Sequence, residues 1–185
     1  MCSSDLYNGS PRAATATTSP SGLGGITVTY DGSTTAPTNA GSYAVIASLS
    51  NANYQAGNAT GTLTINRAAP TVSVTVPSGP VTYDGNTHPA TGFAYGVGGS
   101  ADVLSPAVTF TYNGGTAAPR SAATYSVSAS FAGNSNYGPA TGTATITIIK
   151  ATPTITWSSP ADIAQGTALG ATQLNATASA AGTFA

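Results

Sequence analysis

Two stretches of the chain decide its fold, because residues 137–154 read YGPATGTATITIIKATPT and residues 54–71 read YQAGNATGTLTINRAAPT. When the two stretches are aligned, Tyr54 corresponds to Tyr137, which lies 83 positions further along the chain. A repeated unit of about eighty residues is too long for a solenoid and is the size of an independent β-sandwich. The repetition therefore predicts an all-β protein made of tandem immunoglobulin-like β-sandwich repeats.

The same alignment divides the chain into four parts. Residues 1–6 (MCSSDL) have neither a basic region nor an apolar core, and the peptide matches one reading frame of a common sequencing adapter, so we expect a non-native leader there. The first repeat covers 7–66 and is nearly complete. The one element that it is expected to lack is its first strand. The second repeat covers 67–149 and is complete, whereas 150–185 begin a third repeat that is truncated.

Alternation of polar and apolar residues predicts about seven strands in the second repeat, the number expected of an immunoglobulin-like sandwich. The pair Asn113-Gly114 predicts a tight hairpin turn, because both central positions of such a turn need a positive φ. The strands are expected at Thr71–Val76, Val81–Tyr83, Gly92–Tyr95, Ala107–Tyr112, Thr116–Ala118, Thr124–Phe131 and Ala140–Ile149.

The joints between repeats are short and end in a proline, Pro70 in Arg67–Pro70 and Pro153 in Lys150–Pro153. Because the last strand of one repeat nearly runs into the first strand of the next, we predict a semi-rigid string of domains. The third repeat holds too few large apolar residues to offset the entropy lost on folding, so we expect it to be partly ordered at best. Those residues are Ile155, Trp157, Ile163, Leu169, Leu174 and Phe184.

Charged residues are scarce throughout the chain. They make up 5% of the 185 residues, Lys and Arg together number 4, and the formal net charge is -1. Nucleic acid binding needs clustered Lys and Arg against phosphate, so we expect no nucleic acid partner. The sequence holds no run of about 18 apolar residues, so we expect no membrane insertion. Cys2 is the only cysteine, which excludes an intrachain disulfide.

Side chains able to do chemistry are equally scarce, so we expect no enzyme activity, no metal site and no cofactor. His88 is the only histidine and follows Asp84 by four residues, so a serine–histidine–aspartate set can be imagined; a solvated turn residue is the stronger interpretation. Asp31 and Asp84 each precede a glycine, Gly85 in the second case. Calcium at a repeat junction is one interpretation, and turn chemistry is the favoured one.

The tyrosines are the remaining candidates for a functional site, since aromatic rings can stack on sugars. Tyr43 and Tyr125 open their strands after a turn and are interpreted as the tyrosine corner of such sandwiches. Tyr54 and Tyr137 follow Asn in loops, so we expect them to be exposed and name them as candidate ligand contacts. Packing is the favoured role for the other repeated tyrosines.

Several motifs recur in the same order in both repeats. They are Tyr83-Asp84-Gly85 with its counterpart Tyr7-Asn8-Gly9, Ala40-Gly41-Ser42-Tyr43, Asn53-Tyr54, Asn136-Tyr137, and the Lys150–Pro153 joint. This ordered set resembles the bacterial immunoglobulin-like repeats called MBG or YDG domains, found in large surface proteins and adhesins. The second repeat departs from the pattern at Ala123, where the first repeat has Gly41.

The resemblance implies an extracellular or bacterial cell-surface location and a non-catalytic structural role, such as a spacer in the stalk of an adhesin. Neighbouring repeats of the same chain are then the expected partners. The alternative is a carbohydrate- or host-protein-binding module that uses loop residues such as 96–104, with a cell-surface glycan or protein as its partner.

Overall fold

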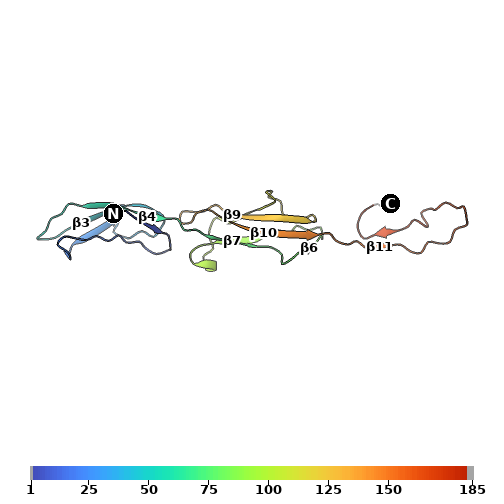
Figure 1. Cartoon of the computed structure of the whole chain (residues 1–185), viewed down its shortest axis with the longest axis horizontal. Helices are drawn as coiled ribbons and strands as arrows, with labels where there is room; N and C mark the ends of the chain where they lie inside the picture. Colours follow the sequence, from blue (N-terminus) through green and yellow to red (C-terminus); the bar gives the residue numbers. More distant parts are fainter. Residues whose placement is uncertain (1, 183–185) are drawn as a thin grey trace.

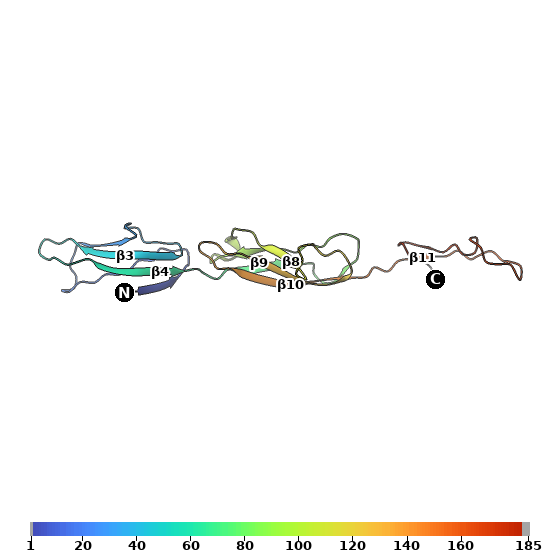
Figure 2. The ribbon, with the colours of Figure 1, turned by 90° about the horizontal axis from the view of Figure 1, so that it is seen from above.

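The computed structural model describes residues 2–182 and shows an elongated molecule, in which two β-domains follow one another and residues 150–182 extend beyond them (Figures 1 and 2). Met1 of the predicted leader and residues 183–185, with Phe184 of the predicted third repeat, lie outside the described residues. Within 2–182 the helical content is one 3-10 turn, η1 (Gly99–Ala101). The chain is therefore an all-β protein built of tandem repeats, as predicted.

The second repeat consists of two sheets. Its larger sheet runs in the order β6 (Val81–Thr82), β10 (Ala140–Ile149), β9 (Ala123–Phe131) and β8 (Thr109–Tyr112), with β6 parallel to β10 and the other neighbours antiparallel. Its smaller sheet pairs β5 (Thr71–Thr75) with β7 (Thr91–Tyr95). The predicted strand at Thr116–Ala118 is wrong, because the chain turns back at Gly115 and then bends away from the ladder.

The turn after β8 has the backbone that its sequence requires. Asn113 and Gly114 have φ values of 48° and 84°. Gly115 N–H donates to Tyr112 O at 3.0 Å, and Tyr112 N–H donates to Gly115 O at 2.6 Å. Both central φ values are positive, as in a two-residue hairpin turn, so this prediction is confirmed.

The first repeat has one sheet where the second repeat has two. Its order is β1 (Cys2–Leu6), β4 (Ala59–Asn66), β3 (Gly41–Leu49) and β2 (Ile26–Tyr30), which repeats the order of the larger sheet in the second repeat. The registers also agree: Tyr30 lies opposite Val45 in the first repeat, and Tyr112 lies opposite Val127 in the second. A sheet corresponding to β5 and β7 is absent from the described part of the first repeat.

Strand β1 places the backbone of residues 2–6 within the sheet of the first repeat. Leu6 lies opposite Asn66, in the same register in which Thr82 of β6 lies opposite Ile149. The sheet therefore begins before residue 7, where the sequence had suggested that the first repeat starts. The non-native origin of residues 1–6 stays a prediction.

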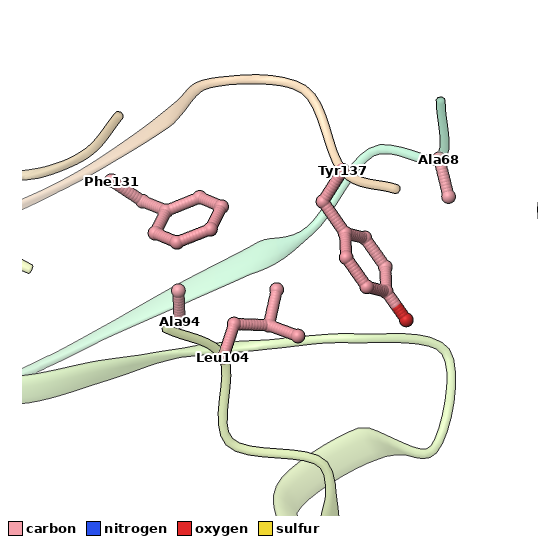
Figure 3. Packing of buried hydrophobic residues seen from close by; sticks show 5 residues of the cluster. All are labelled: Ala68, Ala94, Leu104, Phe131 and Tyr137. Atoms are coloured by element: carbon pink, nitrogen blue, oxygen red, sulfur yellow. The ribbon is translucent and has the colours of Figure 1, made fainter. Parts of the chain in front are cut away.

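The core of the second repeat lies between its two sheets. Val127, Ala129 and Phe131 on β9 are fully buried, each 0% exposed, and Phe131 packs beside Ala94 and Leu104 (Figure 3). The matching positions on β3 of the first repeat are only partly buried; these are Val45, Ala47 and Leu49. In the described part of the first repeat no strand pair like β5–β7 lies over that face of β3, and residues 13–19 border it across a groove, so these side chains stay partly exposed.

Residues 150–182 form no packed domain in the described structure. They contain a short antiparallel pair, β11 (Ile155–Thr156) with β12 (Thr177–Ala178). Across these described residues no side chain is buried. Between residues 2 and 182, no helix has the length and apolar character needed to cross a membrane.

Candidate functional site

The best-built polar site of the molecule lies at the junction between the two repeats, around Tyr137. This residue sits in the loop between β9 and β10, and its ring packs with Leu104 and with Ala68 of the joint (Figure 3). On the side of the first repeat, the ring of Tyr7 meets that of Tyr137 edge-on, with ring centroids 5.3 Å apart and planes at 79°. Such edge-to-face pairs contribute about 0.5–1.5 kcal/mol beyond the area that they bury.

Backbone hydrogen bonds hold the joint itself in place. Ala68 N–H donates to Asn136 O at 3.0 Å, and Gly138 N–H donates to Ala68 O at 2.9 Å. Ala68 therefore continues the pairing of strands as a parallel bridge opposite Tyr137. The linker is thus hydrogen-bonded to the second repeat two residues after the end of β4, which leaves little free chain between the repeats.

The side chain of Asn136 ties the second repeat to a loop of the first. Its Nδ2 donates to Asn39 Oδ1 at 3.1 Å, and its Oδ1 accepts from Ala40 N–H at 2.9 Å. The Asn amide carries both an NH2 donor group and a carbonyl acceptor, so this one side chain bonds to a side chain and to a backbone N–H across the junction. Hydrogen bonds, an aromatic pair and a strand bridge together make the junction a semi-rigid contact.

The hydroxyl of Tyr137 is held in the second repeat by the loop after β7. It donates to Asp102 Oδ2 at 3.0 Å and accepts from Val97 N–H at 2.9 Å. Burial raises the pKa of Tyr137 above its ordinary value of 10.0, and the Asp102 carboxylate raises it further, against the lowering by Val97 N–H. The ring therefore stays a neutral phenol at the centre of the junction.

The expected exposure of Tyr137 is wrong, whereas Tyr54 is exposed as expected. Tyr137 is 4% exposed and Tyr54 is 47% exposed, although both follow Asn in the same loop of their repeats. Tyr137 is less exposed than Tyr54 because Ala68, Leu104 and Tyr7 of the first repeat pack against its ring. Tyr54 borders an open groove of about 630 Å³ along the uncovered face of β3 and β4.

Tyr43 and Tyr125 have the geometry of a tyrosine corner, in which the hydroxyl bonds to the backbone just upstream. Tyr43 Oη donates to Asn39 O at 2.8 Å, and Tyr125 Oη donates to Ser121 O at 3.0 Å. In the first repeat the corner has a further effect, because it positions Asn39, the residue that Asn136 binds across the junction.

Asp84, Gly85 and His88 form a local turn. Asn86 donates to Asp84 from its backbone N–H at 2.8 Å and from its side-chain amide at 3.0 Å, and these bonds lower the pKa of the Asp84 carboxyl. His88 Nε2 lies 3.1 Å from Asp84 Oδ1. Gly85 has a φ of 79°, and its carbonyl accepts from Arg120 Nε at 2.7 Å.

His88 is partly buried and not the solvated residue that the sequence suggested. For the residues that the structure describes, no hydrogen bond joins its imidazole to a serine hydroxyl. The imagined serine–histidine–aspartate set is therefore not assembled in residues 2–182.

Asp31 also serves a turn. It has a φ of 47°, and its Oδ1 accepts from Ala44 N–H at 2.8 Å, as Asn113 Oδ1 accepts from Ser126 N–H at 2.8 Å in the second repeat. Asp31 and Asn113 therefore have the same role: a side-chain oxygen accepts a backbone N–H and stabilises the turn. Residues 2–182 contain no group of three or more His, Cys, Asp or Glu side chains placed to hold a metal ion.

The two prolines differ in their surroundings: Pro70 is partly buried after the bridge at Ala68, whereas Pro153 is exposed ahead of β11. Sequence reasoning placed Ala68 in the joint Arg67–Pro70 but missed Asp102 as a part of the junction. Asp102 could not have been found from the repeats, because it lies in an insertion of the second repeat and has no counterpart in the first.

The comparison with protein families agrees with this architecture. The family model described as MBG domain matches the chain twice, at residues 3–69 and at residues 72–152. No protein among the curated sequences matches the chain significantly. Because the two matches together cover most of the chain, and each spans one of the observed repeats, the chain belongs to the MBG domain family and carries two of its domains in tandem.

Proposed function

We propose that this chain is a non-catalytic spacer of a bacterial cell-surface or secreted protein, in the role of an adhesin stalk. The observation that carries the proposal is the junction, in which Tyr7, Asn39 and Ala40 of one domain bind Asn136 and Tyr137 of the next. A spacer has to hold the parts on either side of it apart. When the joint between two domains does not rotate freely, each added domain increases the end-to-end distance by a fixed amount.

Two further properties support the same role. The MBG domain family is not a known enzyme family. The surface holds few charges and many Thr and Ser side chains, and so it offers little electrostatic attraction to other macromolecules.

Small-angle X-ray scattering tests whether the junction holds the two domains in an extended arrangement. We expect one extended distance distribution for the wild-type chain. We expect a broader one with a shorter mean for the double variant Tyr7→Ala, Asn136→Ala, because both contacts across the junction are then lost. The control is Asn53→Ala with Tyr54→Ala, which also replaces one Asn and one Tyr but does so away from the junction. Identical scattering from all three chains would contradict a semi-rigid junction.

The proposed cell-surface location can be tested with antibodies. Antibodies raised against the two domains should label intact cells of the bacterium that carries the gene. Labelling that appears only after the cells are lysed would contradict a surface role.

A carbohydrate- or protein-binding module is the second candidate, and the exposed ring of Tyr54 favours it. The loop at 96–104 adds Val97 and Val103, whose side chains are exposed. A glycan array probed with the chain distinguishes the two functions. Selective binding that is lost in Tyr54→Ala supports the module, and absence of binding supports the spacer. Tyr137→Ala is not a suitable probe, because it would disturb the junction.

A further inference from the structure

The corresponding edge strand has an open side in both domains. Strand β2 ends the sheet of the first domain and β8 ends the larger sheet of the second, and among the described residues no further strand pairs with either. After each of these strands the chain turns back and makes one bridge, Tyr30 with Ser33 and Tyr112 with Gly115. It then leaves the sheet, so the rest of each strand has no partner strand on that side.

The hydrogen bonds of the two turns show which main-chain groups face the open side. Tyr30 N–H donates to Ser33 O at 2.7 Å, and Tyr112 N–H donates to Gly115 O at 2.6 Å, so both N–H groups point away from the neighbouring strand. Because this direction alternates along a strand, every second residue before the tyrosine also offers its N–H and C=O on the open side. These residues are Ile26 and Val28 in the first domain, and Val108 and Phe110 in the second.

The side chains of both strands suit a sheet that continues past this edge. Val28 and Phe110 pack against the cores of their domains, whereas Thr27 and Thr109 are exposed. Ile26 is an apolar side chain 36% exposed at the edge itself. Natural edge strands are often protected from pairing by charged residues or proline, and β2 and β8 contain neither.

A second copy of the chain is the partner that offers the same two edges at the same spacing. In Figure 2 the sheet of the first domain runs from β4 to β3 in the direction in which the sheet of the second runs from β10 to β9, so β2 and β8 lie along one side of the molecule. A two-fold axis perpendicular to the sheets places two copies side by side and antiparallel. Each β2 then faces the β8 of the other copy, and the interface is self-complementary.

We infer that two copies of this chain associate side by side and antiparallel, by pairing β2 of each copy with β8 of the other. The register that keeps the incoming strand clear of the turns places Ile26 opposite Phe110, and Val28 opposite Val108, of the other copy. Each such pair exchanges two main-chain hydrogen bonds. One contact between strands this short is weak, but the second contact forms within the same complex and is therefore favoured by a high effective concentration.

Sedimentation velocity of the full chain under reducing conditions tests the association. We expect a reversible equilibrium between the 17.9 kDa chain and a species of twice that mass. Ile26→Lys puts a charge into both edge contacts and should raise the Kd for dimerisation more than about tenfold. The matched control is Ile46→Lys, because Ile46 is 37% exposed on the inner strand β3, and this variant should keep the wild-type Kd. Circular dichroism of both variants should match the wild type, since both side chains are exposed.

Disulfide cross-linking tests the register. Thr27 and Thr109 come opposite each other in the inferred pairing, at a position without hydrogen bonds where Cα atoms of antiparallel strands lie about 4.5 Å apart, within the range of a disulfide. Thr27→Cys and Thr109→Cys are made separately in a Cys2→Ser chain, since Cys2 is the only cysteine. Oxidation of the mixture should join one chain of each kind, whereas either variant alone should not cross-link.

Three results overturn the inference. The first is a chain that stays monomeric at every concentration. The second is a dimer that tolerates Ile26→Lys or is dissociated equally by Ile46→Lys. The third is cross-linking of Thr27→Cys to itself, because β2 would then pair with β2 of the other copy and the copies would not have the inferred arrangement.

Discussion

At the scale of the residue, Tyr54 and Tyr137 show how one sequence position takes two roles. The local turn is the same in both, since Asn53 N–H bonds to Asn51 Oδ1 as Asn136 N–H bonds to Asn134 Oδ1. What differs is the chain that surrounds the ring. Tyr137 is surrounded by the loop of Asp102 and by the preceding domain. The sequence near Tyr54 does not indicate that Tyr54 lacks both of these neighbours.

Tyr137→Phe should destabilise the second domain, because it removes the hydroxyl that Asp102 and Val97 share. Two hydrogen bonds are lost and their partners stay half-buried, so the expected loss is about 1–3 kcal/mol in the free energy of unfolding. Urea denaturation measures it. Tyr54→Phe is the control, and its exposed ring predicts a change within about 0.5 kcal/mol. Equal effects of the two substitutions would contradict the assigned role.

The same hydroxyl predicts how stability depends on alkaline pH. The folded state raises the pKa of Tyr137, chiefly by burial, so its proton is bound more tightly in the folded than in the unfolded chain. The stability that this group contributes is complete below the unfolded pKa of about 10 and is lost as the pH rises through the higher folded pKa. Thermal unfolding between pH 8 and 11 should show a steeper alkaline decline for the wild type than for Tyr137→Phe, and parallel curves would refute the prediction.

At the scale of the element, strands and turns could be predicted where a local pattern determines them. Alternation located β9 and β10, and the Asn113-Gly114 pair located the hairpin with positive φ at both positions. The strand expected at Thr116–Ala118 does not form, because these residues directly follow the tight turn and bend away from the sheet. Contacts of the junction could not be predicted, because they join loops whose lengths differ between the repeats.

Core positions on β3 and β9 should respond differently to truncation. Phe131→Ala removes a side chain that is fully buried, so the expected loss is about 3–5 kcal/mol. Leu49→Ala removes its partly buried counterpart on the open face of the first domain and should cost about 1–2 kcal/mol, since much of that side chain already faces the groove. Chemical denaturation of both variants gives the comparison. A cost for Leu49→Ala as large as that for Phe131→Ala would show that the groove is covered in solution.

At the scale of the whole molecule, residues 150–182 should exchange their amide hydrogens much faster than the two domains. They bury no side chain among the described residues, and the pair β11–β12 is too short to protect itself. Hydrogen exchange followed by mass spectrometry measures this difference. Strong protection beyond Leu169 under these conditions would contradict a third repeat that is partly ordered at best.

The two domains should also unfold separately, the first domain at lower denaturant. The second domain has two sheets that enclose Val127, Ala129 and Phe131, whereas the first has a single sheet with an open face. Less apolar surface is buried in the first domain, and its unfolding free energy is correspondingly smaller. Tyr7 packs against buried residues of both domains, so Tyr7→Ala should lower both transitions. Hydrogen exchange followed by mass spectrometry in increasing urea resolves them by peptide. A single coincident transition for peptides of β3 and β9 would mean that the junction couples the domains into one cooperative unit.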